Sequence, residues 1–207
     1  MQAFPAMWRT LKILHDELFF WFGLSILWWV GILLVIPAAP VTAGLCAVAN
    51  CSANYKRVDA ELFWDHAKSN IKRSCLLVGT DLILIAVVVM NIMFYGSSSS
   101  TLARVVVIPL LWLIVLLLIG SQYLLPLVSH QENSSLFLTF RNAFLVALRY
   151  PLFSLLMLIF QIALVVMSIV TVLPFFLLMP ASVAVAANVG LVTILQDMDL
   201  IPTPPRM

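Results

Sequence analysis

The chain alternates long apolar stretches with short segments that carry nearly all of its charges. Residues 18–55 contain no charged side chain, and neither do residues 150–196. At roughly 1.5 Å per residue, single helices of these lengths would extend about 57 and 70 Å, roughly twice the hydrocarbon core of a bilayer. Each stretch is therefore expected to cross the membrane and return.

Proline marks the expected turn in both stretches. The turns are predicted at Pro37–Pro40, within the sequence IPAAPVTAG, and at Pro174–Pro180, because proline removes a helix hydrogen bond and clashes with the preceding turn. Small residues follow each turn and would let the returning helix pack closely against its partner. They are Ala43, Gly44, Ala47, Ala49, Ala181, Ser182, Ala184, Ala186, Ala187 and Gly190.

A third pair of segments is predicted at 75–95 and 102–128, joined by GSSSS at 96–100. The total is then about six membrane segments. Two of these remain open as full crossings or re-entrant segments: residues 181–196, and residues 41–55, which are short and rich in polar side chains.

An amphipathic stretch precedes each pair, with apolar residues at helical spacing and basic residues beside them. We expect these stretches to lie along the membrane interface. The three stripes are Phe4, Met7, Trp8, Leu11 and Leu14; Ala60, Phe63, Trp64, Ala67 and Ile71; and Phe137, Phe140, Ala143, Phe144 and Ala147.

The predicted fold class is thus all-α: a polytopic transmembrane bundle of three helical hairpins, each preceded by an interfacial helix. It forms one domain, 1–207, with pseudo-repeat units at about 4–57, 59–128 and 135–196. The similarity between the units is faint, and the shared hydropathy of membrane hairpins explains it equally well.

Composition agrees with a membrane protein, since 63% of the residues are hydrophobic, 10% are charged and the mean hydropathy is +1.11. The net charge of +2 is too small to indicate nucleic-acid binding. The uncharged run after Glu17 exceeds a signal-peptide core of about 7–15 residues, so the first span is expected to be retained as an anchor.

The basic residues predict the orientation. With six crossings, all Lys and Arg except Arg104 fall on one side, which the positive-inside rule assigns to the cytoplasm together with both termini. The location is therefore expected to be a cell membrane, crossed several times. The basic residues on that side are Arg9, Lys12, Lys56, Arg57, Lys68, Lys72, Arg73, Arg141, Arg149 and Arg206.

Polar residues inside apolar spans are the candidate site, because burying them in a bilayer is costly. Counting along the predicted helices places six of them in one layer about 8–15 Å below the cytoplasmic surface. They are Asp81, Gln122, Tyr123, Gln161, Asn188 and Asn50. The layer is either a pocket centred on Asp81 and open to the cytoplasm, or a set of hydrogen bonds between packed helices.

A second candidate surface is the polar and basic run between the first and second pairs, which would contact a partner protein or lipid headgroups. It comprises His66, Lys68, Asn70, Lys72 and Arg73. The spacing of His15, His66 and His130 does not indicate a metal site. The chain has no P-loop, nucleophile elbow or H-E-x-x-H motif, so no catalytic residue and no cofactor are predicted.

Three stretches resemble the YesL-like bacterial membrane proteins of unknown function: IPAAPVTAGLCAV at 36–48, LFWDHAKSNIKRSCLLVG at 62–79 and YLLPLVSHQENSSLFLTFRNAFLVALRYPL at 123–152. They resemble, in order, the family's proline turn, its aromatic-then-K-x-N segment and its P-V-x-x-H segment, which reads Pro126, Leu127, Val128, Ser129, His130 here. Asp81 stands where the family pattern would have an apolar residue.

This resemblance implies a bacterial inner membrane as the location. It also implies an accessory role near carbohydrate uptake, since family members often accompany carbohydrate-uptake genes. The expected function is therefore a non-enzymatic membrane accessory protein, in contact with the bilayer and with a membrane permease. The alternative is a small oligomeric transporter or channel that uses the polar layer. A membrane enzyme acting on a lipid-linked substrate is disfavoured because no acid, base or nucleophile set converges by spacing.

Overall fold

The computed structural model describes residues 3–34, 37–56, 58–98, 100–130 and 135–202, and every regular element within them is an α-helix. Arg57 and Arg206, which entered the orientation argument, lie outside these residues. In chain order the helices are α1 (Ala3–Asp16), α2 (Leu18–Leu33), α3 (Ala38–Ala53), α4 (Ala60–Ser69), α5 (Ile71–Gly96), α6 (Thr101–Ser121), α7 (Leu124–Val128), α8 (Leu136–Arg149), α9 (Pro151–Thr171), α10 (Leu173–Leu177) and α11 (Met179–Asp197).

The helix breaks predicted at the proline groups are confirmed. In the first stretch α2 ends at Leu33 and α3 begins at Ala38, after Pro37. In the second, α9 ends at Thr171, and α11 begins at Met179 with proline in its first turn. Proline fits the first turn because backbone N–H groups there have no hydrogen-bond acceptor within the helix, so the lack of an N–H costs nothing.

Four helical stretches in the described residues are long and apolar enough to cross a membrane. They are α5, then Ala103–Val128, which includes most of α6, then α9, and finally α11. A fifth span is possible if α1 and α2 count as one, although they are bent by 91° at Glu17. The chain therefore contains four to five candidate spans, where about six segments were expected. The difference lies in the first pair, because α2 and α3 have only 16 residues each.

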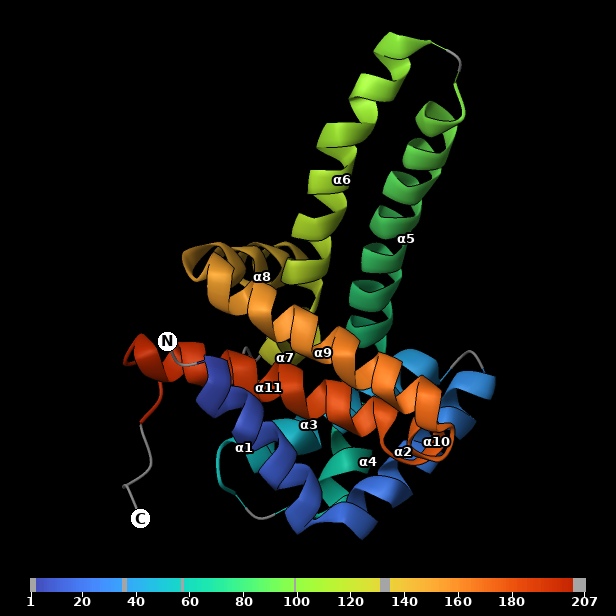
Figure 1. Ribbon diagram of the computed structural model, residues 1–207. Coiled ribbons are helices and arrows are strands. Elements are labelled where there is room, and N and C mark those ends of the chain that lie inside the picture. Colours follow the sequence, from blue (N-terminus) through green and yellow to red (C-terminus); the bar gives the residue numbers. More distant parts are fainter. Residues whose placement is uncertain (1–2, 35–36, 57, 99, 131–134, 203–207) are drawn as a thin grey trace.

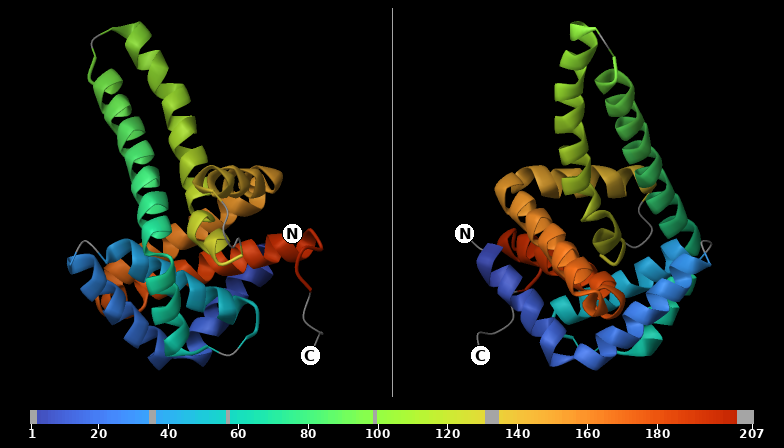
Figure 2. Two further views of the ribbon diagram at one scale, coloured as in Figure 1. Left: turned by 180° about the vertical axis from the view of Figure 1, so that it is seen from behind. Right: turned by 45° about the vertical axis from the view of Figure 1, so that its right-hand side comes forward.

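The α5–α6 hairpin stands apart from the rest of the protein. Figures 1 and 2 show it rising from a compact body, with α9 and α11 running across its base instead of alongside it. Only 11% of the residues are buried in the most apolar part of α5, and the same fraction is buried in the span that contains α6. In α11 the buried fraction is 78%. The helices therefore do not form a simple bundle of parallel hairpins.

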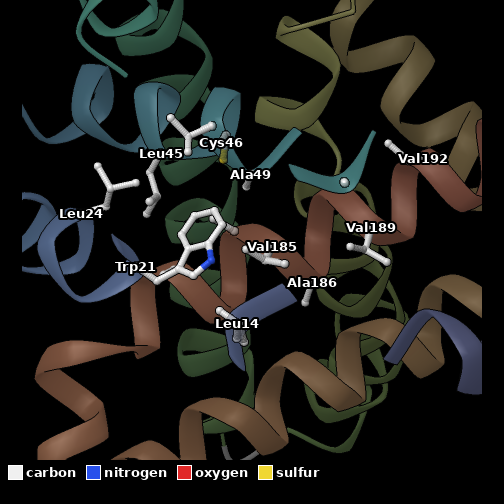
Figure 3. Close-up of a cluster of buried hydrophobic side chains, with 14 of the residues drawn as sticks. Leu14, Trp21, Leu24, Leu45, Cys46, Ala49, Val185, Ala186, Val189 and Val192 are labelled. Atoms are coloured by element: carbon white, nitrogen blue, oxygen red, sulfur yellow. The ribbon is translucent and has the colours of Figure 1, made fainter. Parts of the chain in front are cut away.

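The core surrounds α11, which packs against α1, α3 and α9. Figure 3 shows Trp21 beside Val185 of α11, and both belong to the main apolar cluster together with Leu45 and Val189. The small residues predicted for close packing on α11 are all buried. A second cluster joins the end of α11 to Tyr123, α7 and α8.

The three amphipathic segments fold as α1, α4 and α8. α1 and α8 turn small residues towards the protein, such as Ala6 and Ala143, and leave large apolar residues outside, whereas α4 buries Phe63 together with Ala67. Phe4 and Trp8 are 71% and 72% exposed, and Phe137 is 75% exposed. A helix with an exposed aromatic stripe suits an interface between water and lipid.

Candidate functional site

Gln122 and Gln161 meet between the end of α6 and the middle of α9. The Gln161 amide donates to the side-chain oxygen of Gln122 at 3.1 Å, and the Gln122 amide donates to the backbone oxygens of Ile119 and Ser154. Gln122 caps the C-terminus of α6, where helical backbone oxygens lack helical partners. Two members of the predicted layer are thus in direct contact.

Both glutamines line a pocket of about 350 Å³ enclosed by residues of α2, α3, α6, α7, α9 and α11. Its other polar side chains include Ser121, and Trp28 and Thr42 on the opposite wall. The Trp28 indole donates to Thr42 at 2.9 Å, and Thr42 donates to the backbone of Ala38. The pocket thus places two amides and a few hydroxyl groups beside an aromatic ring, within a lining that is otherwise mostly apolar.

Asp81 lies next to this pocket without lining it. Its carboxylate is 2.7 Å from the Ser121 hydroxyl, which is also 2.8 Å from the backbone oxygen of Leu117. A hydroxyl has one proton, so Ser121 donates to only one of them at a time. Ser121 thereby links the carboxylate to the pocket wall, and Asp81 joins α5 to α6 at the base of the hairpin.

Asn50 and Asn188 belong to a separate cluster. The Asn50 amide donates to the side-chain oxygen of Asn188 at 3.2 Å and lies 2.7 Å from Nε2 of His130. Asn54 donates to the Asn50 side chain at 3.0 Å, and Asn188 donates to the backbone of Ala184. These bonds join α3, α11 and the segment after α7.

Burial lowers the pKa of His130 from its ordinary value, and the nearby positive charge of Lys56 lowers it further. His130 is therefore neutral at pH 7, and one ring nitrogen can accept the Asn50 amide proton. This cluster is an uncharged hydrogen-bond network.

Tyr123 is fully buried and donates from its hydroxyl to Ser154 of α9 at 3.1 Å. Ser154 also accepts the Gln122 amide through its backbone oxygen. Tyr123 and Gln122 therefore both bond to Ser154, which links the buried tyrosine to the glutamine pair.

The predicted layer thus divides into the glutamine pocket with Tyr123, the neighbouring Asp81–Ser121 contact and the Asn50–Asn188 cluster. Sequence analysis found no metal site at His130 and predicted no polar partner for it, and it missed Ser121 and Ser154. Ser121 could have been suspected because it precedes Gln122, whereas Ser154 carries no signal that distinguishes it from other serines in apolar helices.

The residues of the second candidate surface have different environments. Lys68 and Lys72 are exposed at the end of α4 and the start of α5, and His66 is half-buried. Asn70 donates to Ser69, while Arg73 donates to the buried hydroxyl of Thr139 at 3.2 Å. Arg73 therefore links α5 to α8, and the two lysines are the freely accessible cations of this group.

Within the described part of the chain, no three His, Cys, Asp or Glu residues are grouped so that they could hold a metal ion. No protein-family model matches the sequence, and neither a curated protein nor a solved structure matches it significantly.

Proposed function

We propose that the chain is a non-enzymatic integral membrane protein that acts as an accessory to a partner permease, as its resemblance to the YesL-like proteins implies for carbohydrate uptake. The observation that carries this proposal is the exposed apolar surface of the α5–α6 hairpin. Met90 and Phe94 are 68% and 71% exposed on α5, and Trp112 is 73% exposed on α6. In a membrane this surface is available to lipid and to the spans of a neighbouring protein.

The hydrogen bonding of the polar residues also supports an accessory role. Asp81, Gln122, Tyr123 and Asn188 each form a hydrogen bond with a group on another helix of the chain. Such bonds between helices stabilise a membrane fold without any chemistry.

Co-purification tests this proposal. The tagged chain is extracted from its native membrane in mild detergent, and bound proteins are quantified by mass spectrometry. We expect a permease to be enriched with the wild-type chain and reduced with Trp112→Ala. Phe19→Ala, which removes an 87% exposed aromatic from α2, is the matched control and should retain it. Recovery of the chain alone or as a homo-oligomer would contradict the accessory role.

The proposed location is a bacterial inner membrane with both termini in the cytoplasm. Arg104 at the hairpin tip donates a hydrogen bond to the backbone oxygen of Ser98. The positive charge of Arg104 is thus bonded within the tip. In a variant lacking Cys46, Cys51 and Cys75, a thiol reagent that cannot cross membranes should label Ser97→Cys in intact cells and leave Lys68→Cys unlabelled. The reverse pattern would invert the orientation.

The second candidate function is a small oligomeric transporter, favoured by the glutamine-lined pocket. The purified chain in liposomes should then take up a labelled neutral sugar without another protein, and Gln161→Leu should abolish uptake. Asn91→Leu, on α5, is the control. Failure of the wild-type chain to take up sugar would leave the accessory role as the better account.

A further inference from the structure

Arg149 and Asp197, the charged residues that flank the apolar stretch 150–196, line the same pocket. Arg149 ends α8 just before α9, and Asp197 ends α11. Figure 1 shows the start of α9, the end of α11 and the start of α1 gathered on one side of the body. Charges that flank apolar spans mark the boundary between water and hydrocarbon, so both side chains are expected at the same membrane surface.

Arg149 and Asp197 line a pocket of about 430 Å³, together with Tyr150 and Thr193. The Tyr150 hydroxyl forms a hydrogen bond with the Asp197 carboxylate, which raises the pKa of Tyr150, and it also contacts Arg149. The deeper walls are apolar and include Phe153, Leu156 and Ile194. One pocket therefore combines a cation, an anion and a hydroxyl with an apolar interior.

A second, larger pocket of about 680 Å³ shares two lining residues, Pro151 and Leu152, with the first. It is almost wholly apolar and follows α6 from Ile119 to Pro109, with Leu155 of α9 on the opposite wall. This part of α6 extends about 15 Å at roughly 1.5 Å per residue. That length is about half of the ~30 Å hydrocarbon core, or one leaflet.

We propose that the two pockets form a binding site for a membrane phospholipid whose headgroup contains a phosphate and a primary ammonium, as in phosphatidylethanolamine. Arg149 binds the phosphate, because guanidinium matches its planar, bidentate geometry. Asp197 accepts a hydrogen bond from the ammonium, and an acyl chain occupies the groove along α6. This site does not rest on the accessory role proposed above, although its groove shares Trp112 with the surface proposed for the permease.

The charges select this class of headgroup over other phospholipids. A headgroup that carries only the phosphate charge has no ammonium to donate a hydrogen bond to the Asp197 carboxylate. A choline headgroup has a positive charge but no N–H to donate to Asp197, which removes the charge-assisted hydrogen bond. The pair of opposite charges in the pocket is therefore complementary to an ethanolamine headgroup.

Lipid titration of the purified chain, followed by native mass spectrometry, tests the proposal. Phosphatidylethanolamine, phosphatidylglycerol and phosphatidylcholine with identical acyl chains are compared. We expect phosphatidylethanolamine to bind about tenfold more tightly than the other two, since one charge-assisted hydrogen bond corresponds to about that factor. Soluble glycerophosphoethanolamine should not compete at the same concentrations, because it lacks the acyl chains.

Variants separate the parts of the site. Arg149→Gln should weaken phosphatidylethanolamine binding about tenfold, and Asp197→Asn should remove its preference over phosphatidylglycerol. Arg141→Gln, which changes an exposed cation on α8, should have no effect. Leu113→Trp alters an exposed groove residue and should weaken binding of all three lipids by filling the groove.

Equal binding of the three lipids by the wild-type chain would overturn the proposal, and so would a preference for phosphatidylglycerol. Unchanged binding by both Arg149→Gln and Leu113→Trp would also overturn it. Because the wild-type comparison needs no substitution, the test stands even if a variant fails to fold.

Discussion

The Ser121 hydroxyl lies 2.7 Å from the Asp81 carboxylate and joins the two helices of the projecting hairpin at its base. Asp81 is half-buried, and its carboxylate accepts a hydrogen bond from the Ser121 hydroxyl. We expect Ser121→Ala to lower the free energy of unfolding by about 1 kcal/mol, because the carboxylate loses a hydroxyl donor. Thermal unfolding in detergent measures this change.

Thr80→Val is the matched control for this bond, since it removes a hydroxyl from an exposed position beside Asp81. It should leave the melting temperature nearly unchanged. If Thr80→Val destabilised the protein as much as Ser121→Ala, the loss could not be assigned to the Asp81–Ser121 contact.

Gly44 lies where α3 approaches α4 most closely. A Cβ atom at this position would be 2.7 Å from the backbone oxygen of Phe63 and 3.2 Å from the Ala67 methyl group. Backbone cannot move aside as a side chain can, so Gly44→Ala should destabilise the protein by about 1–3 kcal/mol. Chemical or thermal unfolding would reveal this loss.

Gly23→Ala is the control, because a Cβ atom on Gly23 of α2 meets nothing within 4 Å. It should stabilise the protein by about 0.5–1 kcal/mol, since alanine loses less conformational freedom in a helix. Opposite signs for the two substitutions are the expected signature of close α3–α4 packing. Equal effects would mean that α3 and α4 are further apart.

Some features of the fold were predictable from the sequence because they depend on local residues, whereas others depend on which helices pack together. Proline and charge set helix ends locally, so the breaks before Ala38 and Met179 were predictable. Small residues indicate close packing but not the partner: Gly44 meets α4, whereas Gly31 of α2 meets Val41 of α3.

The candidate site was harder to predict because a residue's depth along a helix does not give its direction. Asp81 and Gln122 were placed at similar depths, yet only Gln122 lines the pocket. Successive residues turn by about 100° around a helix, so the rotation and tilt of each helix decide which polar groups meet. Both depend on tertiary packing, and the tilt of α9 and α11 across the hairpin base was not encoded in hydropathy.

Asn50 and Asn188 provide a test of the polar contact between α3 and α11. Asn188 is fully buried, so Asn188→Ala should cost about 1–3 kcal/mol. A double-mutant cycle with Asn50→Ala should give a coupling of about 0.6 kcal/mol, the average for hydrogen bonds between membrane helices. Asn91, which donates to Val87 of its own helix, is the control partner and should show no coupling to Asn188.

His130 should make stability depend on pH. Its pKa is lowered in the folded protein by burial and by Lys56, so the unfolded chain binds more protons between the folded value and the ordinary value of 6.5. The free energy of unfolding therefore rises with pH across this interval. The contribution of neutral His130 is fully present above the interval and is lost as the pH falls from 6.5 towards the folded pKa. Melting temperatures measured from pH 5 to 8 would show the decline on the acidic side.

Substitution separates His130 from the other titrating groups. His130→Gln keeps a side-chain oxygen that can accept the Asn50 amide but does not titrate, so its melting temperature should vary less between pH 5 and 8. His15→Gln changes an exposed side chain that is 86% accessible and should keep the wild-type pH profile. A profile that His130→Gln leaves unchanged would mean that another group controls the acid sensitivity, and the proposed neutral state of His130 in the Asn50 cluster would lose its support.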